Sequence, residues 1–363
     1  MSGVWGKRIE LSIFGESHGP AIGVTLHGLP AGFMVDMEHI SRQMRRRRPG
    51  HNEWSTPRKE ADDVEIISGL FQGRTTGAPL TAIIRNQDKK SKDYEALKDV
   101  MRPSHADYVA YVKYHKAHDY RGGGHFSGRL TAPLVFAGAL AAQLLSTKSM
   151  ETKAVITSIG GQHADLIDVM TLKKEDLQAL QERDCPTLVE SQWKKLQGMI
   201  EEARIQLDSV GGTIQCVTMG VPPGVGDPFF HSLESHLSGL LFSIPAVKGV
   251  SFGSGFALAD MKGSEANDPL CYEQGQVVSQ TNHNGGILGG ISTGMPLDIH
   301  LVMKPTPSIG QEQDTVDVKK SENAKLTIQG RHDPCIVPRA LPVVEAAVSL
   351  ALLDMMMWSQ VWN

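Results

Sequence analysis

Two short segments of the sequence place an imidazole beside other groups that can transfer protons. Gly15-Glu16-Ser17-His18-Gly19 sets a carboxylate, a hydroxyl and an imidazole between glycines. Loops of this kind commonly face solvent or a ligand, although serine and glutamate also satisfy turn amides. In Arg102-Pro103-Ser104-His105-Ala106-Asp107, Ser104 can cap a helix, so that His105 would stand in its first turn beside free amides. Because imidazoles suit acid-base chemistry near neutral pH, His18 and His105 are candidates for it.

Arginine and glycine segments supply what an anionic ligand needs. The run Arg45-Arg46-Arg47-Arg48 ends an expected helix, where positive charge also complements the helix dipole. Guanidinium groups bind carboxylate and phosphate oxygens bidentately, and a nucleic-acid surface is the rival use of such a run. The glycine-rich segment 119–129 opens an apolar helix. Amides at a helix start bind phosphate well, although a sharp turn alone would also explain the glycines.

Three later segments, 282–290, 304–308 and 330–335, also concentrate glycine and polar groups. Together with the earlier loops they predict one large pocket for a ligand with phosphate, heteroaromatic and carboxylate parts. The sequence has neither G-x-G-x-x-G nor a Walker pattern, which disfavours a Rossmann or P-loop nucleotide site. His115 and His118 have a spacing that suits a metal, but no third ligand accompanies them, so no metal site is predicted.

Composition indicates a globular protein of 363 residues, with 40% hydrophobic and 21% charged residues. A formal net charge of −4 disfavours a nucleic-acid role. The N-terminal segment lacks the pattern of a signal peptide, and the four cysteines form no C-x-x-C pair. The longest nearly apolar run, 133–145, is too short to cross a bilayer. We therefore expect a cytoplasmic protein that binds neither nucleic acid nor membrane.

The hydrophobic pattern predicts an α+β fold in a single domain over residues 1–363. Strands are expected in neighbouring runs rather than in strict alternation with helices, which disfavours a doubly wound parallel sheet. A division near residues 150–210, where composition shifts, is the alternative. The expected strands are 8–14, 21–26, 64–68, 80–85, 213–219, 247–252 and 297–303. The expected helices are one that follows Asp36 and those over 104–118, 127–146, 171–207 and 338–358.

Five motifs, taken in order, resemble those of the chorismate synthase family. They are Gly-Glu-Ser-His-Gly at 15–19, Arg-Arg-Pro-Gly at 47–50, Arg-Pro-x-His-Ala-Asp at 102–107, Asp-Tyr-Arg-Gly-Gly-Gly at 119–124 and Gly-Arg-His-Asp-Pro-Cys at 330–335. Segments 244–250, 282–292 and 304–306 resemble the family at corresponding places. The resemblance implies antiparallel sheets sandwiched between outer helices, and a homotetramer. It also implies a 1,4-anti elimination of phosphate from 5-enolpyruvylshikimate 3-phosphate, giving chorismate, that requires reduced FMN (FMNH2) without net redox change.

The same resemblance implies roles for individual residues. His18 would protonate the departing phosphate, His105 would protonate or stabilise the reduced flavin near its N1, and Asp333 would help flavin N5 accept the C6 proton. A poor leaving group and a weakly acidic C–H need such paired proton transfers, and electron donation by a reduced flavin eases C–O cleavage. The substrate would contact Ser17, Arg47, Arg102, Arg129 and Arg339. The flavin would contact His125, Phe126, Ser127, Ala246, Gly289, Lys304, Pro305, Thr306, Pro307, Ser308 and Arg331.

The sequence departs from the family pattern in three places. Many members have Arg-Ser-Ser-Ala-Arg where this chain has His125-Phe126-Ser127-Gly128-Arg129. Many carry an arginine at the position of Glu53, which would repel an anion, so Arg58 is the substitute that the sequence offers. Many also carry an acidic residue and glycine where His27-Gly28 stands. No candidate proton-transfer residue is replaced. With no extra domain to reduce flavin, we expect an external flavin reductant.

Two other functions compete with the FMN-dependent lyase. A flavin- or nucleotide-binding oxidoreductase would exchange hydride with a nicotinamide, for which the sequence shows no Rossmann fingerprint. A non-catalytic protein that binds anions through Arg45–Arg48 would not need His18, His105 or Asp333. Replacing these three residues therefore separates an enzyme from an anion-binding protein.

Overall fold

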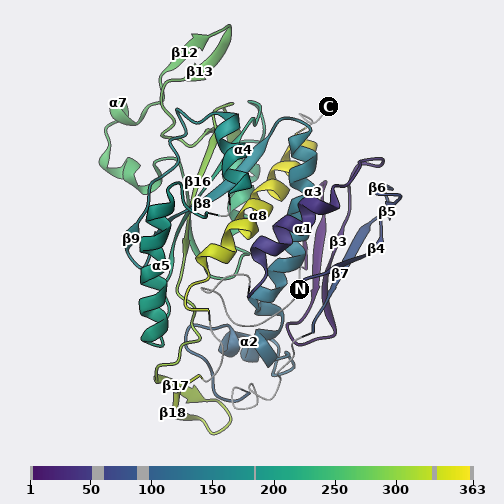
Figure 1. Cartoon of the computed structure of the whole chain (residues 1–363), viewed down its shortest axis with the longest axis vertical. Coiled ribbons are helices and arrows are strands. Elements are labelled where there is room, and N and C mark those ends of the chain that lie inside the picture. The colour runs from purple at the N-terminus through teal and green to yellow at the C-terminus, as the bar shows by residue number, and fades with distance from the viewer. Residues whose placement is uncertain (1–2, 51–60, 88–97, 184, 329–332, 360–363) are drawn as a thin grey trace.

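Two antiparallel sheets, with helices packed between them, form the body of the computed structural model (Figure 1). The structure describes residues 3–50, 61–87, 98–183, 185–328 and 333–359. In sheet order, the first sheet consists of β1 (Val4–Trp5), β2 (Leu11–Gly15), β3 (Ala21–Leu26), β7 (Leu80–Arg85) and β4 (Val64–Ser68). The second consists of β11 (Val247–Phe252), β16 (Leu297–Met303), β10 (Gly212–Met219), β8 (Glu151–Ile159) and β9 (Gln162–His163).

Helices and short hairpins complete the described chain. The helices are α1 (Met37–Arg47), α2 (Asp107–Lys113), α3 (Thr131–Ser146), α4 (Lys174–Glu182), α5 (Glu190–Ile205), α6 (Leu233–Leu241), α7 (Gly263–Ala266) and α8 (Val337–Trp358). The hairpins are β5 (Leu70–Phe71) with β6 (Arg74–Thr75), β12 (Leu270–Glu273) with β13 (Gln276–Ser279), β14 (Ile287–Leu288) with β15 (Ile291–Ser292), and β17 (Gln313–Asp317) with β18 (Glu322–Leu326).

Alternating side chains on the strands decide which face of each sheet is buried. In β3, Ile22 and Val24 are buried in the main core, where Ile22 lies opposite Ile84 of β7. In β8, Ile156 belongs to the main core, whereas Val155 belongs to a smaller cluster on the other face that includes Leu180 of α4. This is the period of two that a pleated strand imposes. The second sheet is therefore covered by helices on both faces.

α3 and α8 pack against each other between the two sheets, α3 against β3 and β7 and α8 against β8 and β10 (Figure 1). The contact is close because α3 carries Gly138, where a Cβ atom would overlap Ala346 of α8. The stretches Arg121–Ser146 and Val337–Trp358 are long and apolar enough to span a membrane, and their most apolar windows are 83% and 94% buried inside the protein. A core helix passes that test too, and burial between sheets explains the apolar composition of both.

The sequence predicts most strands of the two large sheets, but it misses β1, β8, β9, α6, α7 and the short hairpins. The strands 21–26, 64–68, 80–85, 247–252 and 297–303 have the expected bounds. Asp36 begins α1 as expected, because its carboxylate accepts hydrogen bonds from the amides of Glu38 and His39 at 2.8 and 2.9 Å. The α+β class is confirmed. Its layers differ from the expected order of sheets between outer helices: α4 is an outer helix, but α3 and α8 lie inside, between the sheets.

Two expected helices and the unpredicted strand β8 differ from the prediction for local reasons. The helix expected over 104–118 is limited to α2, because Ser104 and His115 have positive φ values of 56° and 50°, which a right-handed helix excludes. The helix expected over 171–207 is two helices, with Pro186 between them. β8 is not predicted, because Lys153 and Thr157 interrupt its apolar residues; both are buried in the structure.

A methyl group at Gly138 should test the contact between α3 and α8. Gly138→Ala must push the two helices apart or strain them, so we expect the free energy of unfolding to fall by about 1–3 kcal/mol. Gly198 of α5, where an added Cβ has no neighbour within 4 Å, is the matched control. Gly198→Ala should instead stabilise the protein by about 0.5–1 kcal/mol. Urea titrations measure both, and equal shifts in the two variants would contradict the close contact.

Candidate functional site

A turn of three consecutive glycines lies between His18 and His105. Gly122, Gly123 and Gly124 have positive φ values of 59°, 82° and 54°, a conformation that glycine adopts without strain. A Cβ on Gly122 would overlap the imidazole of His18, and one on Gly123 would lie 3.2 Å from Cε1 of His105. The backbone amide of Ser17 also donates to the Gly124 carbonyl at 3.1 Å. Two histidines far apart in the sequence thus meet the same short turn.

His105 is held by a buried carboxylate and an arginine. Its Nδ1 lies 2.6 Å from Oδ1 of Asp107, which also accepts from Nη2 of Arg102 at 2.8 Å. The second oxygen of Asp107 accepts from Nε of Arg102 at 2.7 Å, and Nη1 of Arg102 donates to Oγ of Ser308 at 3.3 Å. Burial disfavours the charged form of Asp107, but the bonds from His105 and Arg102 outweigh it and hold its pKa well below the ordinary value.

Residues 304–308, which follow β16, connect the contacts of His105 with those near Asp333. Nζ of Lys304 donates to the carbonyl of Ser104 at 2.9 Å, and the amide of Lys304 donates to the carbonyl of Ala246 at 2.9 Å. Burial and the charge of Lys248 lower the pKa of Lys304. Further along, the carbonyl of Thr306 accepts from the hydroxyl of Ser209 at 2.6 Å.

Val210, which follows Ser209, contacts the predicted motif 330–335. The amide of Val210 donates to the carbonyl of Pro334 at 2.8 Å. Asp333, which precedes Pro334, pairs with Nη1 of Arg339 in the first turn of α8, and Nε of Arg339 donates to the carbonyl of Arg47 at 3.2 Å. Through these contacts α8 and the end of α1 belong to the same site.

Asp62 is a buried carboxylate shared by two buried arginines. Its oxygens pair with Nη1 of Arg47 at 2.9 Å and with Nη1 of Arg129. The remaining guanidinium nitrogens of Arg47 donate to Oγ1 of Thr131 at 3.1 Å and to the carbonyl of Gly128 at 2.9 Å. All three charged side chains are at most 4% exposed. The cluster therefore fixes the end of α1 against the start of α3.

In the described part of this cluster, the positively charged side chains outnumber the carboxylates. Burial would raise the pKa of Asp62, but Arg47 and Arg129 outweigh burial and lower it. Burial lowers the pKa of Arg47 to about 10; Asp62 opposes that shift, and the nearby cations Arg339 and Arg129 add to it. Among the residues that the structure describes, three guanidinium groups thus lie close to two carboxylates, those of Asp62 and Asp333. The excess of positive charge favours an anionic ligand.

Asn86, just after β7, closes the set of contacts. Its Oδ1 accepts from Nε of Arg129 at 3.1 Å, and its Nδ2 donates to the carbonyls of Glu16 and Gly19 at 3.1 and 3.0 Å. The arginine cluster is therefore joined to the loop that carries His18. We call the resulting closed series the contact ring; its members are the loop 16–19, Gly122, Gly123, His105, Asp107, Arg102, Ser308, Thr306, Ser209, Pro334, Asp333, Arg339, Arg47, Asp62, Arg129 and Asn86.

Two buried hydroxyl groups of the contact ring lack a hydrogen-bond partner within the described part of the chain. They are Oγ of Ser17, whose residue is fully buried, and Oγ1 of Thr306. A buried hydroxyl without a partner is costly, so each is suited to a polar ligand group. Ser17 lies beside the imidazole of His18, and Thr306 lies within the predicted flavin segment. Both the substrate and the cofactor expected from the sequence fit this observation.

Not every predicted residue joins the contact ring. Gly289 lies in the turn between β14 and β15, with φ 60° and open space where a Cβ would be. Nδ1 of His125 lies 2.8 Å from the carbonyl of Gly15, and the ring of Phe126 lies 6.2 Å from that of Tyr114. Ser127 accepts from the amide of Arg129 at 3.3 Å and caps the turn there. Arg331, Glu53 and Arg58 fall outside the described residues.

Four site residues escape the sequence analysis: Asp62, Asn86, Asp107 and Ser209. Asp107 stands inside the quoted motif 102–107, two residues after His105, and that spacing is the signal that could have identified it. Asp62 and Asn86 flank strands without any motif. Their roles depend on where Arg47 and Arg129 arrive in space, which no local pattern encodes.

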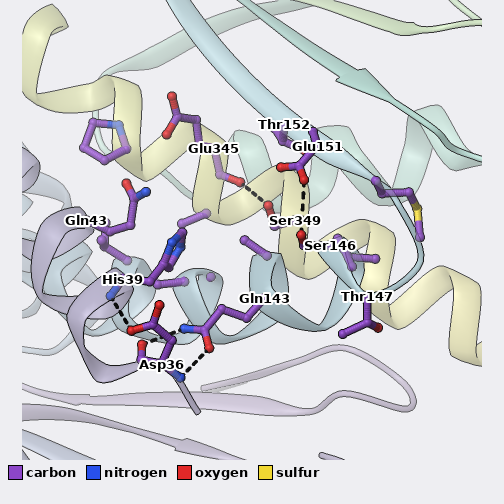
Figure 2. A pocket seen from close by; sticks show the side chains of 18 of the residues that line it. Asp36, His39, Gln43, Gln143, Ser146, Thr147, Glu151, Thr152, Glu345 and Ser349 are labelled. Carbon is purple, nitrogen blue, oxygen red and sulfur yellow. Dashed lines mark hydrogen bonds between the residues drawn. The ribbon is translucent and has the colours of Figure 1, made fainter. Parts of the chain in front are cut away.

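A separate cavity of about 370 Å³ opens between α1, α3, β8 and α8, and none of the predicted site residues lines it (Figure 2). Most of its polar groups bind one another: Asp36 holds the first amides of α1, the Gln143 side chain pairs with the backbone of Asp36, and Ser146 donates to Glu151 at 3.1 Å, whereas Nε2 of His39 has no hydrogen-bond partner among the described residues. Polar groups satisfied in this way serve the fold. The contact ring, with its two histidines and its excess cations, is therefore the candidate functional site.

Comparison with known proteins identifies relatives along the whole chain. A family model described as chorismate synthase matches residues 9–357. A chorismate synthase of Thermococcus kodakarensis is 45% identical over 358 residues, which cover 99% of this chain and 98% of that protein. One of Korarchaeum cryptofilum is 43% identical over 356 residues, covering 98% of each. A solved structure titled "Crystal Structure of Chorismate Synthase" matches with a TM-score of 0.77 at 25% identity, over 98% of this chain and 93% of that one.

Replacing Asp62 should reveal how strongly the buried cluster depends on one charge. Asp62→Asn keeps the shape of the side chain but leaves two buried guanidinium groups without their shared counter-ion. We expect the free energy of unfolding to fall by about 3–5 kcal/mol in urea titrations at neutral pH. Glu65→Gln, which breaks an exposed pair with Arg85, is the control and should cost less than about 1 kcal/mol.

The same comparison has an expected pH dependence. Because the folded-state pKa of Asp62 is lowered, its contribution is present above the ordinary carboxyl pKa of about 3.9 and is lost as the pH falls toward the folded-state value. The difference between the wild type and Asp62→Asn should therefore shrink only below about pH 4. Equal stability of the two proteins at neutral pH would contradict a role for Asp62 as counter-ion.

Proposed function

The chain belongs to the chorismate synthase family, carbon-oxygen lyases of the shikimate pathway, and we propose that it eliminates phosphate from 5-enolpyruvylshikimate 3-phosphate in a 1,4-anti reaction that requires reduced FMN. The observation that carries this proposal is the contact ring. It joins His18, His105 and Asp333 to four arginines through short contacts between segments spread over the whole chain. These are the groups that such an elimination needs: proton donors, a proton acceptor and fixed cations.

His18 is the group placed to protonate the leaving phosphate. It is buried beside Ser17 and the glycine turn, so that little water competes for its proton. Asp333, on the far side of the arginine cluster, would assist removal of the C6 proton, while its pair with Arg339 holds the carboxylate in place. His105 would hold or supply a proton at the flavin. Proton transfers of this kind are each worth roughly 10²- to 10⁴-fold in rate.

Arg47 and Arg102 are held within the protein by their own hydrogen bonds. Each guanidinium nitrogen of Arg47 and of Arg102 donates to a protein partner. We expect these two residues to hold the shape of the pocket and to add positive charge. We propose that Arg129 and Arg339, together with the buried hydroxyl of Ser17, contact the phosphate and carboxylates of the substrate.

The residues after β16 are suited to hold the flavin. Lys304 supplies a partly buried cation, and Thr306 supplies a buried hydroxyl. The carbonyl of Ala246 accepts from the amide of Lys304, and the hydroxyl of Ser308 accepts from Arg102. Reduced FMN, when bound, supplies transient electron density that eases C–O cleavage. Pro305, Pro307, Ser127, His125, Phe126, Gly289 and Arg331 complete the proposed flavin contacts.

We also expect the setting that is typical of this enzyme family. The proposal includes a single domain, a homotetramer, a cytoplasmic location and an external reductant for the flavin. The continuous hydrophobic core, which takes residues from both sheets and from α3 and α8, supports the single domain. Sedimentation or light scattering of the purified protein decides the oligomeric state.

An anaerobic assay tests the reaction directly. Protein incubated with 5-enolpyruvylshikimate 3-phosphate and FMN reduced by dithionite should release phosphate and chorismate in equal amounts. The same mixture with oxidised FMN should release neither. Product without reduced flavin, or none in its presence, would refute the proposed function.

Replacing His105 separates its chemistry from flavin binding. His105→Ala should still bind FMN but should lose turnover by about 10²-fold or more, because the group that holds a proton at the flavin is gone. His163→Ala, a change at an exposed histidine on β9, should leave turnover unchanged. Flavin fluorescence titration and the anaerobic assay measure the two properties. Wild-type turnover in His105→Ala would remove the role assigned to this residue.

A further inference from the structure

The carboxylate of Asp107 contacts the edge of the His105 imidazole that faces away from the glycine turn. Nδ1 lies 2.6 Å from Oδ1 of Asp107, whereas Gly123 lies against Cε1 and Nε2, at 3.2 and 3.3 Å from its Cβ position. The ring is thus fixed between a carboxylate on one side and the turn on the other. Nδ1 is bound to Asp107, and Nε2 faces the glycine turn that His18 also contacts.

The contact also fixes where the imidazole proton lies. Because the bonds from His105 and Arg102 keep the pKa of Asp107 well below its ordinary value, the carboxylate is ionised and can only accept. A carboxylate oxygen 2.6 Å from a ring nitrogen therefore requires a proton on that nitrogen. Nη2 of Arg102 also lies 3.1 Å from the same Nδ1 and could donate to it only if that nitrogen had no proton, but the carboxylate oxygen is closer, at 2.6 Å, and can only accept, so the proton belongs on Nδ1.

Arg102 fixes the carboxylate in turn. It pairs with both oxygens of Asp107, and its third nitrogen reaches Ser308. Lys304 contributes by binding the carbonyl of Ser104, which has a positive φ of 56° next to His105. A carboxylate held from two sides has one orientation toward the imidazole, which is what selection of a tautomer needs.

We propose that Asp107 is a positioning residue for the reaction: it holds neutral His105 as the Nδ1–H tautomer, so that Nε2 carries the lone pair and can take up and return a proton without movement of the ring. The inference rests on the proposed function, because it gives that proton a use at the flavin. It reassigns Arg102 from a substrate contact to the support of this pair. The same logic applies to other catalytic histidines whose second nitrogen is held by a carboxylate.

Nitrogen-15 NMR of histidine-labelled protein tests the tautomer without substrate or flavin. In alkaline buffer the wild type should show His105, assigned by its absence in His105→Ala, with the proton on Nδ1. Asp107→Asn should show a mixture or the Nε2–H form, because an amide can donate as well as accept. Asp36→Asn makes the same change at the start of α1 and should leave the His105 signal and turnover unchanged.

Kinetics then separate positioning from a purely structural role. Asp107→Asn should lower kcat by about 10²-fold or more with little change in KM, and Asp107→Glu should recover part of the loss. A wild-type His105 with its proton on Nε2 would overturn the proposal, even if Asp107→Asn failed to fold. So would Asp107→Asn with normal turnover, or with reduced turnover and an unchanged tautomer. If the wild type made no chorismate, the proposed function would fail, while the tautomer would still decide this inference.

Discussion

A single buried carboxylate, that of Asp62, allows two arginines to be buried where four parts of the chain meet. Arg47 ends α1, Arg129 precedes α3, Asn86 follows β7, and Arg339 begins α8. Buried guanidinium groups without a counter-ion are strongly unfavourable, so the arrangement depends on Asp62 being present and ionised. The apolar packing of α3 against α8 brings these ends together. The carboxylate of Asp62 allows Arg47 and Arg129 to remain charged although they are buried.

The charge left over in this cluster is what connects the fold to its chemistry. In the described part of the chain, three guanidinium groups lie near two carboxylates, and the pKa of Arg47 falls to about 10 under burial and the neighbouring cations. A bound phosphate or carboxylate would relieve that imbalance.

The two histidines are prepared differently for proton transfer. Asp107 holds His105, and Arg102 donates to both oxygens of Asp107. These bonds make that side of the site rigid. His18 lies beside the buried hydroxyl of Ser17, which has no hydrogen-bond partner in the described part of the chain. The turn at Gly122 and Gly123 separates the two imidazoles and excludes side chains from the space between them. The side of the site around His105 is therefore fixed by protein contacts, whereas the side around His18 offers a buried polar group.

The sequence by itself determined the α+β class, most strands of the two large sheets and the segments that carry the candidate residues, because periodicity, Asp36 as a helix cap and short motifs such as 15–19 and 102–107 are local. It also determined the family, since the order of those motifs is written in the chain. Only the tertiary structure decided that α3 and α8 lie between the sheets, that Asp62 is shared by Arg47 and Arg129, and that Asp107 pairs with Arg102. These depend on which residues meet across long separations, and no local pattern specifies a partner that arrives from another part of the chain.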